Sequence, residues 1–197
     1  MCNEVRRTVA LGQIRDDFSQ IRIPLRFPEG IPNLAPLESI RITDPTAIVR
    51  MGAEGAELVQ RRWSWPGPGG KPVYNFRSEG REFASGRCLI PVDGFFEFTD
   101  PPPMEGAPKK RKKDKWLFTK AGEDWFCIAG LVRAAGEIGE AFTMLTTDPG
   151  PDVAPYHNRQ VAVIDRADWG HWLNPAVPAR DILKPLPQGT LQVTQVR

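Results

Sequence analysis

The sequence has few of the residues that build disulfide scaffolds or metal centres. Its three cysteines, Cys2, Cys88 and Cys127, are odd in number, and no two are close enough in sequence to form a metal knuckle. This usage indicates a reducing, intracellular compartment, so we expect a cytoplasmic location. The two histidines, His157 and His171, leave a zinc site short of ligands. We therefore expect neither a metal nor another cofactor.

Long apolar runs are scarce as well. No stretch approaches the roughly 20 apolar residues of a membrane-spanning helix, and the first residues form no hydrophobic signal region. We expect no membrane association. The formal net charge is only +2, so any footprint for nucleic acid must be local.

Proline and glycine, in contrast, are abundant, with 20 and 18 of the 197 residues. So many turn formers favour numerous short elements over a helical bundle. Apolar residues make up 41% of the chain, which is enough for one core, and no clean linker divides it. We predict a single β-rich α+β domain over residues 1–197, and a monomer, because neither a helical seam nor a long bare edge is evident.

Apolar alternation and β-branched residues predict where the elements lie. Residues 8–27 should mix helix and loop, 66–72 should be irregular, and 101–115 should be a proline-rich basic loop. Short helices are expected at the start of 81–100 and after Asp165. Strands are expected late in 31–43, at 46–51, as a hairpin in 53–66, at 87–98, as two strands joined at the turn AGED in 116–135, in 140–150, in 159–164 and in 189–197.

The opening MCNEVRR places a cysteine at the second position. Met1 is expected to be removed because residue two is small, which leaves Cys2 with an amine and a thiol on adjacent carbons. Their ordinary pKa values, about 8 and about 8.5, keep both groups partly available at neutral pH. The amine can condense with an aldehyde to an imine, and the thiol can then close a thiazolidine ring. The alternative is a cysteine that merely follows Met1.

A second segment, YNFRSEG (74–80), carries Asn75 and Arg77. The two side chains share a face if the segment is extended. Asn75 could hydrogen-bond beside the N-terminus, and Arg77 could hold a phosphate because its fork binds two oxygens at once. Solvated surface is the alternative.

A third segment, RCLIPVDGFFEF (87–98), places Glu97 between phenylalanines. Glu97 either faces solvent at a sheet edge or is buried. If it is buried, desolvation should raise its pKa and make it a proton shuttle near pH 7. Cys88, on the same predicted strand, is expected in the core.

A fourth segment, PYHNRQVAVI (155–164), places His157 at a junction of loop and strand, where functional groups often lie. Arg159 follows two positions later, on the same face if the chain is extended. A histidine satisfied by its surroundings is the alternative, and we expect His171 to serve packing.

Aromatic and basic residues also alternate at Trp63 and Trp65, which follow two arginines. That arrangement suits single-stranded nucleic acid, through base stacking and charge, although core packing is the commoner use of tryptophan. The basic run KKRKK (109–113) is either a solvated loop or an accessory phosphate contact.

Together these segments resemble the SRAP family, the SOS-response-associated peptidase proteins that cross-link to abasic sites in DNA. The resemblance covers most of the chain and is carried by six motifs in the family's order. MC resembles the MCGR opening, PNLAPLESIRI the N-x-A-P segment, and RRWSWPGP the W-G-L-x-P segment. YNFRSEG resembles N-A-R-x-E, RCLIPVDGFFEF resembles R-C-[LI]-[IV]-P-x-x-G-[FY]-[FY]-E-W, and FTMLTT with HNRQVAVI resembles F-x-[IL]-[IL]-T followed by H-x-R-M-P-V-I-L.

The resemblance implies a fold with a curved, barrel-like mixed sheet, and a function. Family members bind single-stranded DNA at an abasic site, whose open-chain sugar presents an aldehyde, and shield the lesion as a thiazolidine adduct. Carried over, Cys2 is the nucleophile, Asn75 orients it or the sugar, Glu97 moves protons, and His157 assists opening of the sugar ring or reversal. A weak lyase activity through the imine is compatible. The family also implies a nucleoid-associated location if the source is bacterial.

The resemblance assigns the DNA contacts to Arg77 and Arg159, which would hold flanking phosphates. The family usually has Gly and Arg after MC, whereas this chain has Asn3 and Glu4. An acid there removes a phosphate contact and should repel DNA, unless Arg6 or Arg7 substitutes. Further departures are Phe98 for a common Trp, and Gln160 and Val161 for Met-Pro. They leave the reactive residues intact and affect DNA affinity.

Two other functions remain open on the sequence. A thiol peptidase would pair Cys2 with His157, although a hydrolase needs no terminal amine. A non-covalent nucleic-acid module would use the Trp and Arg segments alone, with equal affinity for intact and abasic strands.

Overall fold

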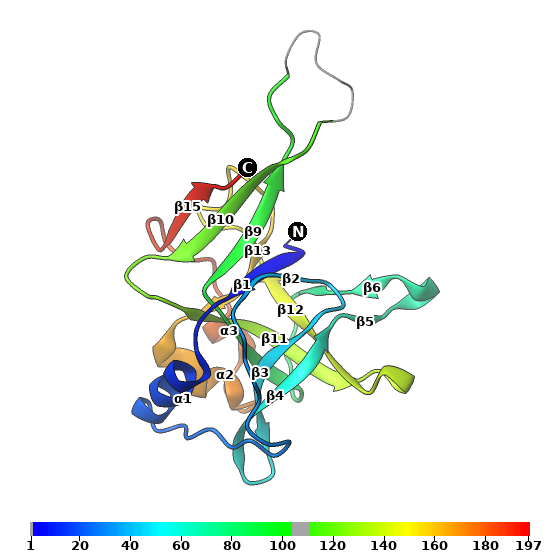
Figure 1. Ribbon diagram of the computed structural model, residues 1–197, viewed down its shortest axis with the longest axis vertical. Coiled ribbons are helices and arrows are strands. Elements are labelled where there is room, and N and C mark those ends of the chain that lie inside the picture. Colours follow the sequence, from blue (N-terminus) through cyan, green and yellow to red (C-terminus); the bar gives the residue numbers. More distant parts are fainter. Residues whose placement is uncertain (1, 104–110) are drawn as a thin grey trace.

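The computed structural model describes residues 2–103 and 111–197 as a β-rich fold with short helices. The basic run falls partly outside these residues, and its described part, 111–113, is exposed chain without regular structure. Figure 1 shows the strands crossing the molecule, with the helices gathered on one side and the β9–β10 hairpin projecting from the top. No helix in the described ranges is long and apolar enough to cross a membrane.

A five-stranded antiparallel sheet holds the start of the chain. Its order is β15-β10-β9-β1-β2, so β1 lies between two partners, with Val5 opposite Phe95 on one side and Ile40 on the other. The bounds are Glu4–Arg7 for β1, Leu37–Arg41 for β2, Gly94–Thr99 for β9, Asp114–Lys120 for β10 and Leu191–Gln195 for β15.

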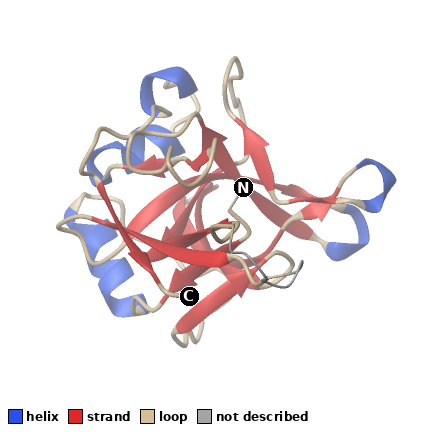
Figure 2. Cartoon of the chain, turned by 90° about the horizontal axis from the view of Figure 1, so that it is seen from above, coloured by secondary structure: helices blue, strands red, loops and turns tan. Residues whose placement is uncertain are grey.

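The second sheet closes on itself. Strand β12 pairs in parallel with β4 and antiparallel with β11, and β3 and β8 connect those two, so five strands form a ring. Figure 2 shows the strands curving around a common centre. This mixed, barrel-like sheet confirms the predicted fold class. The bounds are Pro45–Gly52 for β3, Gly55–Trp63 for β4, Asn75–Arg77 for β7, Arg87–Val92 for β8, Phe126–Ala134 for β11, Glu140–Thr147 for β12, Gln160–Val161 for β13 and Val163–Ile164 for β14.

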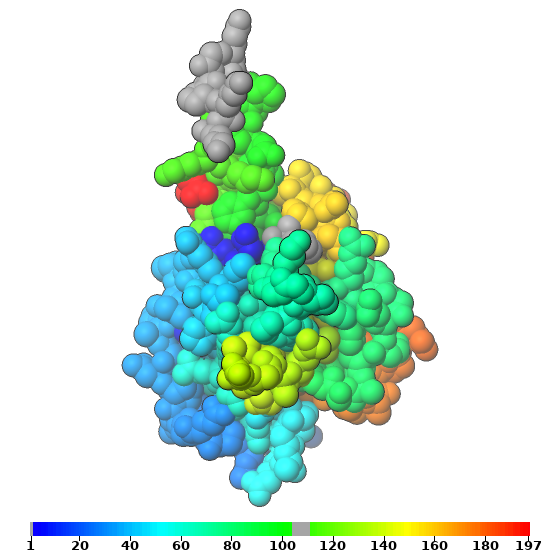
Figure 3. Space-filling model, turned by 90° about the vertical axis from the view of Figure 1, so that its right-hand side faces the viewer, coloured from blue at the N-terminus to red at the C-terminus, as the bar shows by residue number. Residues whose placement is uncertain are grey.

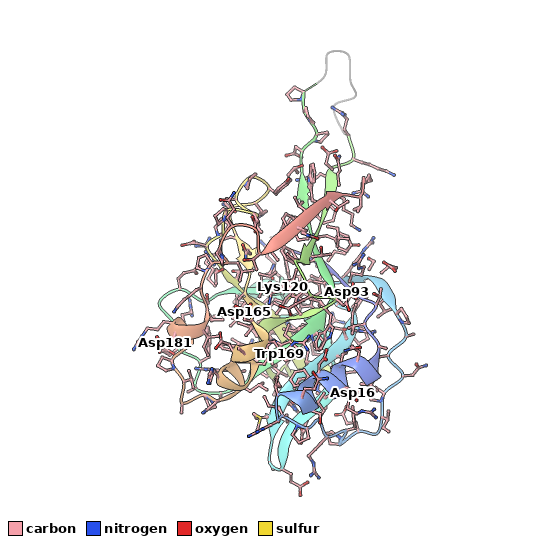
Figure 4. The ribbon with its side chains drawn as sticks, turned by 90° about the vertical axis from the view of Figure 1, so that its left-hand side faces the viewer. Asp16, Asp93, Lys120, Asp165, Trp169 and Asp181 are labelled. Atoms are coloured by element: carbon pink, nitrogen blue, oxygen red, sulfur yellow. The ribbon has the colours of Figure 1, made fainter. Side chains whose placement is uncertain are left out.

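The helices are short and pack on the outside of the barrel. Helix α1 turns Ile14 and Phe18 inward, and the Phe18 ring stacks on Trp169 at 4.7 Å between centroids (Figure 4). Trp125, the residue before β11, connects that strand to α1: its indole N–H donates to the carboxylate of the buried Asp17 at 2.7 Å. The bounds are Leu11–Gln20 for α1, Trp169–Leu173 for α2 and Ala179–Ile182 for α3.

The predicted single strand 87–98 is two strands in different sheets. The chain bends at Asp93, whose buried carboxylate accepts hydrogen bonds from the Arg6 guanidinium, from the Thr8 backbone and hydroxyl, and from the Val9 N–H. Gly94 follows because a side chain there would meet Leu117 at 2.6 Å. One residue thus moves the chain from the barrel to the five-stranded sheet.

The predicted helix at the start of 81–100 is wrong. Gly86 adopts φ +73°, and a Cβ there would lie 2.5 Å from the Val132 carbonyl oxygen. The Phe83 carbonyl instead accepts from the buried Arg87 side chain at 2.7 Å, so the segment is held as a turn.

Of two smaller predictions, the irregular stretch 66–72 needs correction and the short helix after Asp165 is confirmed. The segment 66–72 contains a turn of 3-10 helix, Pro68–Gly70, beside the strand pair β5 (Trp65–Pro66) and β6 (Pro72–Val73). Asp165 precedes a 3-10 turn, Arg166–Asp168, before α2, and its carboxylate pairs with Lys120 at 2.7 Å rather than capping the helix (Figure 4).

Candidate functional site

Cys2 lies buried at the entrance to strand β1. It precedes Glu4, where β1 begins, and only 1% of its surface is exposed. The thiol donates to the Glu4 carbonyl at 3.3 Å. Burial raises the pKa of this thiol above its usual range, and the nearby Glu97 carboxylate raises it further. The thiol is therefore protonated in the resting protein.

Asn75 holds the backbone of Cys2 from the second sheet. Strand β7 pairs in parallel with β12, with Asn75 opposite Met144. The Asn75 amide nitrogen donates to the Cys2 carbonyl oxygen at 2.6 Å. Its amide oxygen is buried and accepts no hydrogen bond from the described residues. Such an acceptor is suited to a donor brought by a ligand.

Glu97 is buried on the inner face of β9. Only 1% of its surface is exposed. Of the two alternatives left open by the sequence, burial is therefore confirmed, and exposure at a sheet edge is wrong. Burial raises the pKa of Glu97 to about 7, although a hydrogen bond from the Cys2 backbone opposes the shift. The carboxyl group is therefore partly protonated at neutral pH and lies next to Cys2.

His157 is fixed at the same end of the barrel. The preceding Tyr156 packs its ring against Trp116 at 4.7 Å, and Trp116 lies opposite Glu97 in the sheet. The Arg159 backbone N–H donates to His157 Nδ1 at 2.9 Å, which leaves the ring proton on Nε2. Burial and the neighbouring cations lower the pKa of His157, so the ring is neutral near pH 7 and presents a donor.

The two arginines assigned to phosphates have different surroundings. Arg77 is exposed on β7, two residues beyond Asn75. Arg159 is buried, and its guanidinium contacts Glu79 at 2.6 Å, Asp148 at 2.8 Å and the Thr146 carbonyl at 2.9 Å. Internal partners thus hold the Arg159 guanidinium, which fastens the His157 turn to the end of β12. Its assignment to a phosphate stays a prediction.

The tryptophans expected to stack on bases are also core residues. Trp63 is fully buried and donates to the Tyr74 carbonyl at 2.8 Å. Trp65 is 4% exposed and covered by the Arg133 guanidinium, 4.1 Å from the ring centroid. Both rings are therefore buried in this structure, which favours the core-packing alternative for these tryptophans.

Arg6 and Arg7, the predicted substitutes for a cation at position four, both have partners within the fold. Arg6 forms an ion pair with Asp93. Arg7 is buried and donates to the carbonyl oxygens of Leu34 and Ala35, at 3.4 and 2.8 Å. Both arginines fasten β1 to its neighbours.

Glu4 differs from expectation as well. It is buried, and its carboxylate accepts from Lys115 and Ser39, each at 2.6 Å. Burial would raise the pKa of Glu4, but these hydrogen bonds hold it below its ordinary value. The charge of the Glu4 carboxylate is therefore balanced by Lys115, and the carboxylate is buried rather than exposed to a DNA strand. Lys115 is 111 residues away, so no local pattern around Glu4 indicates the pair.

The candidate site groups Cys2, Asn75 and Glu97 from three segments of the chain, and His157, from a fourth, is predicted to complete it. Figure 3 shows the first residues, in dark blue, set below the green β9–β10 hairpin and bordered by the blue-cyan and gold parts of the chain. Across residues 2–103 and 111–197, no three His, Cys, Asp or Glu side chains group as metal ligands do.

Comparisons with known proteins identify the family of this chain. The family model for SOS response associated peptidase (SRAP) matches residues 1–197. The chain is 28% identical over 207 residues to abasic site processing protein YoaM of Bacillus subtilis, covering 94% of this chain and 85% of the relative. It is 27% identical over 203 residues to YoqW of the same organism, which carries the same description, covering 92% and 85%.

Solved structures share the fold. A crystal structure of a protein from Bordetella bronchiseptica superposes with a TM-score of 0.72 at 23% identity and covers all of both chains. A phage-related protein from the same organism gives a TM-score of 0.73 at 20% identity, covering 100% of this chain and 94% of its own. On the match over its whole length, this chain belongs to the SRAP family.

Proposed function

We propose that this chain binds single-stranded DNA at abasic sites and, once Met1 is removed, bonds to the lesion through Cys2 as a thiazolidine. The observation that carries the proposal is the placement of Cys2 between the Asn75 amide and the buried Glu97 carboxyl group. The relatives described as abasic site processing proteins support the choice of substrate. The adduct would shield the lesion.

The first step forms an imine. The amine of Cys2 attacks the C1′ aldehyde carbon of the opened sugar, and a proton passes from nitrogen to oxygen to give a carbinolamine. A second proton, from Glu97, then lets the hydroxyl leave as water and leaves a cationic imine. Glu97, with its pKa near 7, is suited to donate that proton because a general acid works best when its pKa is close to the working pH. The neutral His157, with its proton on Nε2, can donate to the sugar oxygen during ring opening.

The second step closes the ring. Sγ of Cys2 adds to the imine carbon, the electrons of the C=N bond return to nitrogen, and the thiol proton passes to Glu97. The resting thiol is protonated, but the cationic imine forms next to it and favours the thiolate at that moment. Aldehyde and aminothiol thus give thiazolidine and one water, with no change of oxidation state.

Two other activities, a lyase reaction and peptide hydrolysis, can be compared with covalent capture on the same geometry. A lyase reaction would eliminate the 3′ phosphate from the imine, and ring closure competes with it by consuming the imine. A thiol peptidase needs a ready thiolate, whereas burial here raises the pKa of the Cys2 thiol. His157 Nδ1, the other half of such a pair, already accepts from Arg159. We therefore place covalent capture ahead of peptide hydrolysis.

The test is a denaturing gel of the purified protein mixed with an oligonucleotide that holds one abasic site. A shifted band should appear. It should not appear with the intact strand, or with a tetrahydrofuran analogue that keeps the gap but lacks the aldehyde. Equal binding to all three strands without a covalent product would instead support a non-covalent module.

A further inference from the structure

Trp116 on β10 is the aromatic side chain directly opposite Glu97 in the five-stranded sheet. The side chains of directly paired residues point to the same face of a sheet, with Cβ atoms about 5 Å apart. The neighbours of Trp116 along β10 point to the other face, and one of them, Lys115, pairs with Glu4 there. Trp116 therefore packs on the inner face, against the core cluster that contains Cys2, and covers Glu97 from β10.

Two neighbours hold the indole of Trp116 in place. Its ring N–H donates to the hydroxyl of Thr99, on β9, at 2.8 Å. The Tyr156 ring packs against it with 4.7 Å between the centroids, and meets the buried Phe118 ring edge-on at 5.4 Å. The position of the indole is thus set both by the strand that carries the acid and by the turn that carries His157.

The contact with Tyr156 also anchors that turn. The backbone N–H groups of Tyr156 and His157 both donate to the carbonyl of Val153, at 2.8 and 3.0 Å, and Val153 is buried in the core. The Tyr156 ring then joins the turn to Trp116 on β10. One indole therefore supports both acid–base groups of the proposed reaction.

We infer that Trp116 is a positioning residue of the cross-linking reaction, which screens Glu97 from water and, through Tyr156, holds His157 at the site. This inference rests on the proposed function, because that function assigns the proton transfers to Glu97. Burial raises the pKa of Glu97 to about 7, and the indole opposite the carboxyl group contributes to that burial.

Other titratable and charged side chains also approach this space. In the described parts of the chain they are Cys2 before β1, Lys113 before β10, Asp114 on β10, and Tyr156, His157 and Arg159 around the turn. The amine of Cys2 joins them once Met1 is removed. Replacing Trp116 by another apolar residue changes none of these charges, so a change in the titration of Glu97 reports on the indole itself.

The experiment follows the carboxyl group without DNA and the reaction with it. Infrared spectroscopy from pH 5 to pH 9 records the bands of protonated carboxyl groups, and Glu97→Gln identifies the band of Glu97. Cross-linking time courses at increasing concentrations of an abasic strand separate the maximal rate from the half-saturating concentration. The variants are Trp116→Val, which loses the ring, and Trp116→Phe, which keeps one. Trp125→Phe, which alters a buried tryptophan that contacts α1, is the matched control.

We expect Trp116→Val to lower the midpoint of the Glu97 band by about one pH unit, because water then reaches the carboxylate from the side of β10. At pH 8 the protonated fraction of Glu97 falls accordingly, so the maximal rate should drop by up to about tenfold while the half-saturating concentration stays native. Trp116→Phe should restore both values. Trp125→Phe should lower stability in urea without moving either.

A native midpoint and a native maximal rate in folded Trp116→Val would overturn the inference, and so would an equal shift in Trp125→Phe. If Trp116→Val does not fold, Thr99→Val and Tyr156→Ala remove the two supports of the indole one at a time, and native midpoints in both variants overturn the inference equally. Failure of the proposed function looks different. The native chain would then form no cross-link, whatever the midpoint of Glu97.

Discussion

The side-chain amide of Asn75 donates a 2.6 Å hydrogen bond to the backbone carbonyl of Cys2, across 73 residues of sequence. This hydrogen bond joins the barrel sheet to the first residues of the chain, and it fixes the direction in which the α-carbon of Cys2 presents its nitrogen and sulfur. Strand β7 carries Asn75 because it pairs with β12 alongside the barrel.

Asn75→Ala removes this hydrogen bond and should slow cross-linking. The free energy of unfolding should fall by about 1 kcal/mol, the usual net contribution of one such bond. Asn75→Asp is the sharper variant, because it keeps the shape but replaces the donor with an acceptor that faces a carbonyl. Quenched time courses on a denaturing gel measure the rate. If Asn75→Asp cross-links at the native rate, the amide does not position Cys2.

Cys2→Ala separates the amine from the thiol. Alanine at residue two also permits removal of Met1, so the variant keeps a terminal amine and should still form the imine. We expect no heat-stable adduct unless borohydride is added, and more strand cleavage than with the native chain, because ring closure no longer consumes the imine. Cys88→Ala, which changes a buried thiol of the barrel, is the control and should form the adduct. A heat-stable adduct of Cys2→Ala without borohydride contradicts the assignment.

Glu97→Gln should change how stability depends on pH. Burial raises the pKa of Glu97 from 4.5 to about 7. The folded state therefore holds the proton more tightly than the unfolded state. The contribution of Glu97 to the free energy of unfolding is complete below pH 4.5 and is lost as the pH rises to 7. The loss amounts to roughly 3 kcal/mol at most.

The measurement is urea unfolding of the protein that retains Met1, with and without Glu97→Gln, from pH 4.5 to pH 8. The native chain should lose stability relative to the variant as the pH rises across that window. Comparing the two chains cancels other groups, such as Glu4, whose lowered pKa acts in the opposite direction. A constant difference across the range would show that Glu97 titrates as an ordinary exposed carboxylate.

Asp93→Asn should destabilise the fold more than its single-atom change suggests. The carboxylate accepts from Arg6, from the Thr8 backbone and hydroxyl, and from the Val9 N–H, and it is buried. An amide leaves the Arg6 charge without its partner and turns a donor toward these N–H groups. We expect a loss of about 2–4 kcal/mol in urea unfolding. Thr8→Val removes only the hydroxyl contact and should cost about 1 kcal/mol; equal effects of the two variants would contradict the central role of the carboxylate.

Much of the fold was predictable from local patterns. The strands at 46–51 and 140–150, and the two joined at AGED, follow from alternation and turn residues, and the structure contains them. The break at Asp93 was not predictable, because the apolar run continues through it and the four donors that hold its carboxylate come from β1 and the residues after it, more than 80 positions away.

The candidate site was predictable where a reactive residue type stands in an unusual position in the sequence. Cys2 and Glu97 are unusual for their positions, and the structure brings them together. The DNA-contact residues were harder, since a Trp or Arg looks the same in sequence whether it faces DNA or the core. Trp63 donates to Tyr74, eleven residues later, and Arg159 pairs with Asp148, eleven residues earlier, and with Glu79, 80 residues earlier; only the folded chain shows these pairings.

The intact mass of the product tests the central claim most directly. Protein lacking Met1, incubated with a strand that holds one abasic site, should gain the mass of the strand less one water, and peptide mapping should place the bond on residue two. If the same preparation keeps its own mass, or if the added mass maps to a lysine, the aminothiol of Cys2 is not what captures the lesion.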